Sequence, residues 1–186
     1  MSFPRFYCDS LSLTAAKLDS VESHHLTKVL RLCQGQSIEL FDGLGGVATA
    51  EIVNIKRSDV ELKVVSIKNL PKPTQSRVII ASSIAKGPRQ DWLISKCTEL
   101  GADIIAGIQF DRTIKVPRTP LDNPRNRNMT ISACKQSGRN FIPQLLGPIR
   151  FTDSIKIFKD QFPDCRMIFG SLAAAAEPIN EIAVSN

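Results

Sequence analysis

The chain has 186 residues, which is enough for one large domain or two small ones. Hydrophobic residues make up 42% and charged residues 23%, the balance of a globular protein. No apolar run is long enough to span a bilayer and the N-terminus lacks a secretory signal, so we expect a cytoplasmic protein with no membrane role. The five scattered cysteines form no C-x-x-C pair, which argues against a metal site, a redox motif or a disulfide framework.

The net charge of +6 is concentrated in the middle of the chain. Residues 74–150 carry 12 basic and 5 acidic groups, whereas residues 151–186 carry 3 and 5. A basic segment favours a polyanionic partner such as RNA, because each cation that meets a phosphate releases condensed counterions. A globular protein that is basic for no functional reason would show the same charge, so the charge alone does not decide.

The first seventy residues are dominated by apolar and polar residues in alternation, which is typical of strands. Turn residues at 42–46 and 56–59 separate these runs, and one short helix is expected over residues 21–30. Several short strands with tight turns and a single helix predict a small barrel. The predicted strands are residues 3–8, 37–41, 47–55 and 60–67.

Two prolines within residues 69–74 predict an extended linker. We therefore expect a barrel domain over residues 1–70 and a second domain over residues 74–186. The second domain alternates strands and helices, which predicts an α/β fold with a parallel sheet. Its expected strands are residues 77–81, covered on both faces, then 104–110 and 167–169. Its expected helices are residues 88–100, 124–137 and 152–162, with a loop over 111–123.

The expected helix over residues 88–100 starts at Pro88 and ends before Gly101, as helices often do. Its apolar face should contain Leu93, Ile94, Cys97 and Leu100, and its polar face Arg89, Trp92, Lys96 and Glu99.

Conventional catalytic and nucleotide-binding motifs are absent from the sequence. His24 and His25 are adjacent, so on a helix they would point about 100° apart and make a poor metal pair. We expect one of them at the surface and the other in the barrel packing. Gly43, Gly45 and Gly46 could imitate a phosphate cradle, but a hairpin turn is the favoured interpretation.

Three polar clusters are candidates for function. Lys28 and Arg31 end the short helix, where cations favourably meet the helix dipole; the alternative is a phosphate contact. Lys86 and Arg89 flank the start of the next helix, where free N–H groups and cations together form an anion site. Lys96 and Glu99 are three residues apart and either belong to that surface or simply pair with each other.

The third cluster is the segment over residues 136–140. Ser137 and Gly138 are typical of a helix end. Gln136, Arg139 and Asn140 offer amide and guanidinium groups that suit phosphates and the base edges of unstacked RNA. We expect Arg112, just past a strand end, to converge on this cluster.

Together these stretches resemble one family, the 16S ribosomal RNA uridine-N3 methyltransferases (RsmE-type) of the SPOUT superfamily. The resemblance runs in order along the whole chain, which makes it more specific than any single motif. Its segments are residues 4–6, 25–32, 38–43, 86–87, 96–101, 111–112, 133–134 and 136–140, with Pro143.

The resemblance implies a PUA-like barrel that holds ribosomal RNA and an α/β domain that ends in a trefoil knot binding S-adenosylmethionine. It implies a homodimer that methylates N3 of a uridine in the 16S RNA of the small ribosomal subunit. Glu99, Arg112 and Gln136 become catalytic candidates, with no general base assigned. The implied RNA-binding residues are Lys28, Arg31, Lys86, Arg89, Lys96, Arg112, Gln136, Arg139 and Asn140.

The chain also departs from the family. Neither glycine-rich segment that forms the cofactor pocket occurs in it, so we expect the cofactor-binding residues to lie beyond Asn186 and the chain as given to be inactive. Lys135 stands where the family commonly has an acidic residue. The alternative is a non-catalytic RNA-binding protein that retains the barrel and the basic surface. An α/β domain without an RNA role would require the matching clusters to be accidental.

Overall fold

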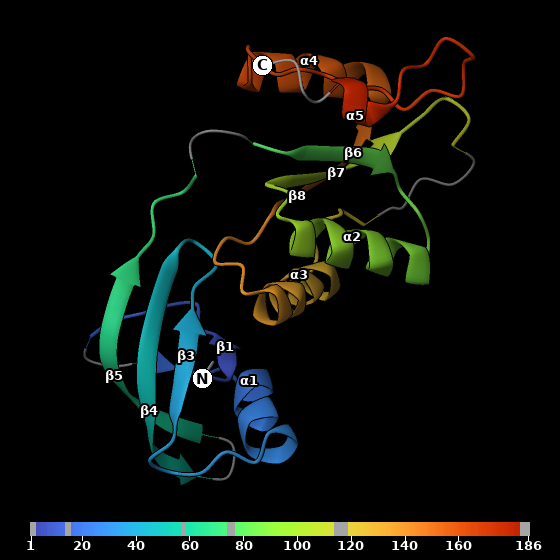
Figure 1. The fold of residues 1–186 in the computed structure, drawn as a ribbon. Coiled ribbons are helices and arrows are strands. Elements are labelled where there is room, and N and C mark those ends of the chain that lie inside the picture. Colours follow the sequence, from blue (N-terminus) through green and yellow to red (C-terminus); the bar gives the residue numbers. More distant parts are fainter. Residues whose placement is uncertain (1–2, 14–15, 57–58, 74–76, 114–118, 183–186) are drawn as a thin grey trace. The chain divides into compact units, whose positions relative to one another are not determined.

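Figure 1 shows a computed structural model of the protein, which describes residues 3–13, 16–56, 59–73, 77–113 and 119–182. The chain forms two compact units, residues 1–151 and residues 152–186. The first unit contains a curled N-terminal sheet and a parallel sheet with two helices. The mixed α/β class predicted from the sequence is therefore confirmed, with a half-barrel followed by a separate parallel sheet.

The half-barrel is a five-stranded sheet with the order β1-β3-β4-β5-β2, in which β1 pairs parallel to β3 and the other pairs are antiparallel. Its core consists of residues such as Phe6, Leu40 and Ile52, which alternate with outward-facing positions. The four strands predicted here are confirmed, whereas β2 was missed because two residues show no periodicity. The strands are β1 (Arg5–Tyr7), β2 (Ala16–Lys17), β3 (Ser37–Phe41), β4 (Gly46–Lys56) and β5 (Asp59–Asn69).

The predicted short helix is present as α1 (Ser20–His24) and the π-helical turn η1 (His25–Val29). Asp19 caps its start, because the carboxylate accepts a hydrogen bond of 2.7 Å from the backbone N–H of Glu22. Arg31 follows in a left-handed conformation with φ of 53°, which ends the helix.

The outer face of the half-barrel carries two rows of side chains that run across four strands. The pairing registers place each row on the face opposite the core, since the residues within a strand are two positions apart. The rows are Arg5–Glu39–Thr49–Ser66 and Tyr7–Phe41–Val47–Lys68.

The parallel sheet has the order β6-β7-β8, with the helices α2 and α3 side by side against it (Figure 1). Apolar residues of both helices and of all three strands form its core, including Ile94 and Ile105, which are fully buried. The elements are β6 (Ile79–Ser83), α2 (Pro88–Leu100), β7 (Ile104–Gln109), α3 (Pro124–Ser137) and β8 (Gln144–Arg150).

One strand prediction is wrong in part and another is wrong altogether. The segment 77–81 was expected to be covered on both faces, but β6 is an edge strand in which Ala81 and Ser83 are exposed. The third strand is β8 and not 167–169, whose side chains are exposed and outside any strand. Gly147 and Pro148, joined by a cis peptide bond, interrupt the apolar pattern of β8, and proline is tolerated because that strand lies at an edge.

The start of α2 at Pro88 and its end before Gly101, which has φ of 88°, are confirmed. The predicted apolar face is wrong at Leu100, which is 82% exposed; the buried positions are Gln90, Ile94 and Thr98. Gln90, Ile94 and Thr98 are spaced by four residues, so the buried face is centred on Ile94, and Leu100 lies about 120° around the helix from it.

The helices α2 and α3 run parallel to each other and antiparallel to the strands. At one end Arg125 Nη2 lies 2.6 Å from Asp91 Oδ2, and at the other Arg139 Nε donates a hydrogen bond of 3.2 Å to the carbonyl of Glu99. The helix starts therefore lie at the carboxyl edge of the sheet and the helix ends at its amino edge. A helix of this length separates the two edges by about 20 Å.

The second unit contains α4 (Phe151–Gln161), which begins at the last residue of the first unit, and α5 (Ile179–Ile182). The predicted helix over residues 152–162 is confirmed. In the part of the chain described here, every helix is too short or too polar to cross a membrane.

The turn between β3 and β4 is the predicted hairpin turn. Asp42 Oδ1 accepts hydrogen bonds from the backbone N–H groups of Leu44 and Gly46, at 2.7 and 2.9 Å. The turn also contacts the segment after α3, because Gly45 N–H donates to the carbonyl of Asn140 at 3.1 Å. Gly45 has φ of 107°, and a Cβ there would lie 2.6 Å from a backbone oxygen.

We expect Gly45→Ala to lower the free energy of unfolding by clearly more than Gly35→Ala, as measured by urea denaturation. Gly35 also has positive φ, but nothing lies within 4 Å of a Cβ there. Its replacement should cost only the backbone penalty of about 1 kcal/mol, whereas Gly45→Ala adds a steric clash. Equal losses in the two variants would show that the surroundings of Gly45 accommodate a methyl group without a steric clash.

Candidate functional site

The candidate residues fall into three groups. The first lies at the carboxyl edge of the parallel sheet and contains Lys86, Arg89 and Arg112, all exposed. Arg150, at the end of β8, belongs to the same edge because it pairs in register with Gln109 at the end of β7. Among the described residues, the side chains of these four cations have no hydrogen-bond or ion-pair partner. The sequence did not single out Arg150, because its strand was not predicted.

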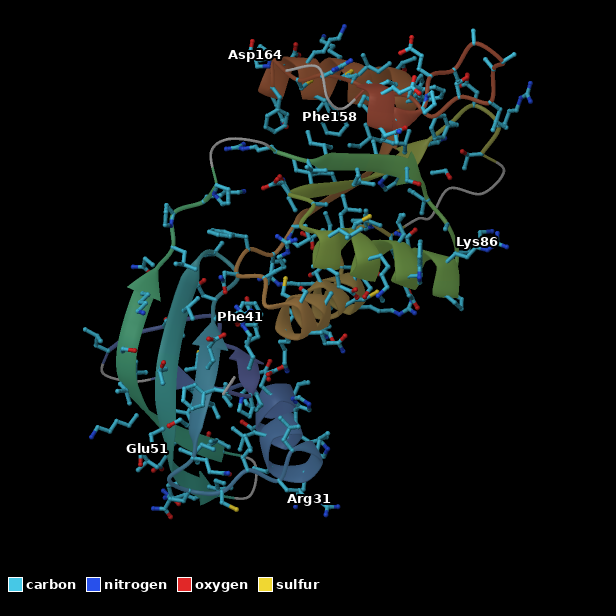
Figure 2. All side chains as sticks on the ribbon, in the orientation of Figure 1. Arg31, Phe41, Glu51, Lys86, Phe158 and Asp164 are labelled. Carbon is cyan, nitrogen blue, oxygen red and sulfur yellow. The ribbon has the colours of Figure 1, made fainter. Side chains whose placement is uncertain are left out.

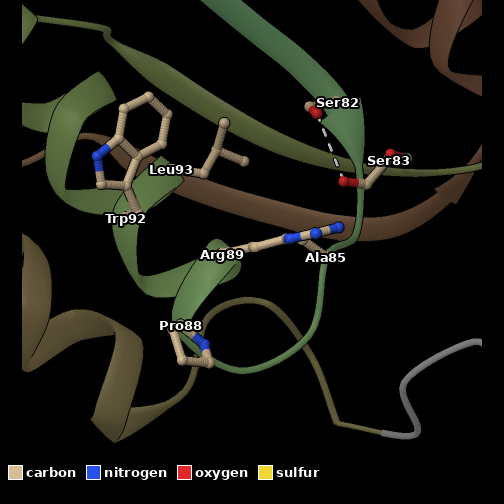
Figure 3. Close-up of a pocket in the computed structure, with 7 residues that line it drawn as sticks. All are labelled: Ser82, Ser83, Ala85, Pro88, Arg89, Trp92 and Leu93. Atoms are coloured by element: carbon tan, nitrogen blue, oxygen red, sulfur yellow. Dashed lines mark hydrogen bonds between the residues drawn. The ribbon is translucent and has the colours of Figure 1, made fainter.

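A shallow pocket of ≈ 550 Å³ lies beside the first turn of α2 (Figure 3). The Arg89 side chain extends across it toward the segment that contains Ala85, and the indole of Trp92 is 65% exposed. A flat indole and a guanidinium can stack on a base and bind a phosphate, respectively. The pocket is lined by Ser82, Ser83, Ala85, Pro88, Arg89, Trp92 and Leu93.

The second group lies at the amino edge and contains Lys96, Glu99, Gln136, Arg139 and Asn140. Lys96 Nζ lies 2.6 Å from Glu99 Oε2, so these two residues form the surface pair that was one of the two expectations. Hydrogen bonds from Lys96 and then from Ser95 lower the pKa of Glu99. A lower pKa weakens Glu99 as a general base.

Arg139 covers the C-terminal end of α2. Its Nε donates to the carbonyl of Glu99, and a Cβ on Gly101 would lie 2.6 Å from its guanidinium. A cation at a helix C-terminus is favourable because of the helix dipole. Arg139 therefore has a structural contact in addition to any contact with RNA.

The expected convergence of Arg112 on residues 136–140 is wrong. Arg112 follows the carboxyl end of β7, whereas Gln136 and Asn140 lie at the opposite edge, one helix length away. The sequence showed that Arg112 follows a strand, but not that α3 returns to the other edge before Gln136 is reached.

The third group is Lys28 and Arg31 on the half-barrel, both exposed. Figure 2 shows Arg31 beside the short helix and Lys86 beside the first turn of α2, so they belong to different substructures. Lys28 lies in the last turn of η1, as the expected charge–dipole interaction requires.

The outer face of the half-barrel packs against α3. Tyr7 and Phe41 form a buried cluster with Ile131 and Cys134, and burial raises the pKa of Cys134 to about 11. Figure 2 shows Phe41 between the half-barrel and the helices. This contact fixes the position of the C-terminal end of α3 over the strands.

Arg5 is the central polar group of this contact, and its side chain is only 9% exposed. Its guanidinium lies 4.3 Å above the ring of Phe41, and its Nη2 donates to Oδ1 of Asn140. Nε lies 3.0 Å from Glu39 Oε1 but outside hydrogen-bond geometry, so the contact is an ion pair. Sequence reasoning missed this role because the partner amide is 135 positions away.

Lys135 forms a second buried ion pair with Glu22, with Nζ 2.7 Å from both carboxylate oxygens. The two side chains are 14% and 9% exposed. Lys135 Nζ also lies 3.2 Å from Nδ1 of His25, a contact that requires the neutral ring. The lysine noted as a departure from the family thus has an acidic partner within this chain.

As expected, His24 is exposed and His25 is partly buried.

Two family models match the chain. One is described as an RNA methyltransferase domain and matches residues 72–183; the other is described as an RNA methyltransferase PUA domain and matches residues 18–65. The first covers more than half of the chain, so the protein belongs to the RNA methyltransferase domain family. The resemblance found in the sequence is confirmed.

The names of individual relatives are more specific than the description of the family model. The ribosomal RNA small subunit methyltransferase E of Synechocystis sp. is 32% identical over 145 residues, which cover 76% of this chain and 44% of that protein. The protein of the same name from Bacillus subtilis is 29% identical over 147 residues, which cover 77% and 57%. The chain thus spans about half the length of these relatives.

Solved structures that match the chain are also described as methyltransferases. The ribosomal RNA small subunit methyltransferase E of Neisseria gonorrhoeae, bound to S-adenosylmethionine, matches with a TM-score of 0.72 and 30% identity over 82% of this chain and 64% of that chain. A structure described as a probable rRNA-methyltransferase from Porphyromonas gingivalis matches with a TM-score of 0.71 and 27% identity, over 82% and 63%.

Within the described residues, no group of three or more His, Cys, Asp and Glu side chains is arranged to hold a metal ion.

We expect His25 to make the folded state sensitive to acid. Burial, and then the cation of Lys135, lower the pKa of His25 below its ordinary value of about 6.5. The unfolded chain then binds this proton more tightly, so the stability contributed by neutral His25 is present above about pH 6.5 and is lost as the pH falls through the lower folded pKa. His25→Asn should reduce the loss of thermal stability between pH 7.5 and 5.5.

His24→Asn is the matched control, because His24 is adjacent in sequence but exposed. The control should lose as much stability on acidification as the unaltered protein. If all three proteins lose the same amount, His25 does not sense pH through this contact.

Proposed function

We propose that this chain is part of an S-adenosylmethionine-dependent enzyme that methylates N3 of a uridine in 16S ribosomal RNA. The observation that carries the proposal is the match of the RNA methyltransferase domain over residues 72–183. The PUA domain match, the names of the relatives and the cofactor bound in the Neisseria structure support it. Cytoplasmic location and a homodimer, with the small ribosomal subunit as partner, belong to the same proposal.

The pocket beside α2 does not fit the whole cofactor. The pocket beside α2 offers Arg89 and Ser83 for a carboxylate, but none of its lining residues is acidic to balance the positive sulfonium. Trp92 is its only aromatic residue and is mostly exposed, so an adenine ring would remain open to solvent. We therefore assign no reaction step through S-adenosylmethionine to these residues.

The four cations at the carboxyl edge are the proposed RNA-binding group of the α/β domain. Open parallel sheets bind ligands beyond the carboxyl ends of their strands, and Lys86, Arg89, Arg112 and Arg150 are exposed there without partners among the described residues. The N3 atom of uridine carries a proton that must leave before methylation. Arg112, at this edge, can stabilise the resulting anion by its charge. Of the three catalytic candidates, Arg112 is therefore the one to which we assign a catalytic role at the carboxyl edge.

A non-catalytic RNA-binding protein is the second candidate function. The observation that favours it is that the exposed cations at the carboxyl edge and the polar residues 136–140 at the amino edge suit RNA. Methyl transfer distinguishes the two candidates.

We expect the full gene product to transfer labelled methyl groups from S-adenosylmethionine to small ribosomal subunits isolated without this modification. N3 lies on the base-pairing edge, so the product should stop reverse transcription at one uridine. The 186-residue chain alone should bind RNA without binding S-adenosylmethionine in a calorimetric titration. If the full product binds RNA but transfers no methyl group, the methyltransferase proposal is wrong and the protein is the non-catalytic RNA-binding candidate.

We expect Arg89→Ala and Arg112→Ala each to weaken binding of single-stranded RNA and to reduce the slope of log affinity against log salt by about 0.7. Lys56→Ala removes one charge from a lysine that is already paired with Glu61, with Nζ 2.7 Å from Oε1, and is the control. A salt series followed by fluorescence anisotropy measures all three slopes. Slopes equal to that of the control would contradict the proposed RNA-binding group.

A further inference from the structure

A cleft of ≈ 670 Å³ lies where the outer face of the half-barrel meets the last turn of α3. Thr49, Ser66 and Lys68 line it from β4 and β5, and Gln136 lines it from α3. Its volume lies in the range of ligand sites, about 300–1,000 Å³, and is sufficient for one nucleotide. The cleft lies within the first compact unit, at the amino edge of the parallel sheet.

The walls of this cleft are held by paired charges. Arg5 is bound by Glu39 and Asn140, and Lys135 is bound by Glu22, so these cations are already compensated inside the protein. Buried, paired charges rigidify a site but do not attract an anion strongly. Lys68 is the remaining cation of the lining and is exposed, with no partner for its side chain within the described ranges.

The neutral groups of the lining are free to bind a ligand. Thr49 and Ser66 are neighbours in register on β4 and β5, and their hydroxyls, like the amide of Gln136, have no hydrogen-bond partner among the described residues. Phe3 adds an aromatic ring that is 47% exposed. Hydroxyls, an amide and one aromatic face match the edge and the ring of an unstacked base.

We propose that this cleft binds one unstacked nucleotide of single-stranded RNA. The base stacks on Phe3, its edge is hydrogen-bonded by Gln136 and Ser66, and its phosphate meets Lys68. Because only one cation is uncompensated, recognition depends more on the base than on the backbone. This inference rests on the proposed RNA function and extends it by a base-binding site at the edge opposite to Arg89 and Arg112.

The test compares a single-stranded oligouridylate with the same oligonucleotide carrying abasic positions, by fluorescence anisotropy on the whole chain. Phe3→Ala and Gln136→Ala should each weaken oligouridylate binding about tenfold, the usual cost of a lost base contact. Neither should change binding of the abasic oligonucleotide. Lys68→Ala should weaken binding of both and reduce the salt slope by about 0.7.

Gln34→Ala is the matched control for Gln136→Ala, because Gln34 is an exposed glutamine that does not line the cleft. The thermal midpoint of each variant shows that it is folded, as expected for substitutions of exposed side chains. Affinities for oligouridylate equal to that of the unaltered protein would overturn the cleft proposal. The proposed RNA function would survive that result if Arg89→Ala and Arg112→Ala still weaken binding, whereas no RNA binding by the unaltered protein would overturn both.

Discussion

The packing of α3 on the outer face of the half-barrel is the contact on which the other features depend. Its apolar part contains Phe41 and Cys134, and its polar part is the buried pair of Glu22 and Lys135. Removing one partner of such a pair leaves a buried charge without compensation, which typically costs about 3–5 kcal/mol. The contact therefore specifies one arrangement of strands and helix, and the cleft exists because that arrangement leaves a gap beside the last turn of α3.

The path of the chain through the parallel sheet separates the candidate residues. Each helix carries the chain from the carboxyl edge back to the amino edge. Candidate residues at the start of a helix therefore lie about 20 Å from those at its end. Arg89 and Arg112 face one edge, and Gln136 and Asn140 face the other. An RNA that contacts both groups must therefore span about 20 Å, the length of one helix.

Local patterns in the sequence predicted most elements. Alternation placed β3 with its observed bounds, and proline and glycine placed both ends of α2. The errors occurred where local pattern and tertiary position disagree. Pro148 concealed β8, and the buried face of α2 includes the polar residues Gln90 and Thr98, so the exposed Leu100 lies outside it. The resemblance identified surface residues such as Gln136, but not the contact between Arg5 and Asn140, because no local pattern links positions more than a hundred residues apart.

That separation in sequence has a consequence for the way the chain is made. The half-barrel leaves the ribosome well before residues 131–142, which cover its outer face and include the partners of Glu22 and Arg5. Until then Tyr7 and Phe41 remain uncovered on a sheet whose other face is already packed. Such an exposed aromatic surface promotes association with other chains. The nascent protein thus has an interval, set by the rate of translation, in which a chaperone or early contact with RNA would be of most use.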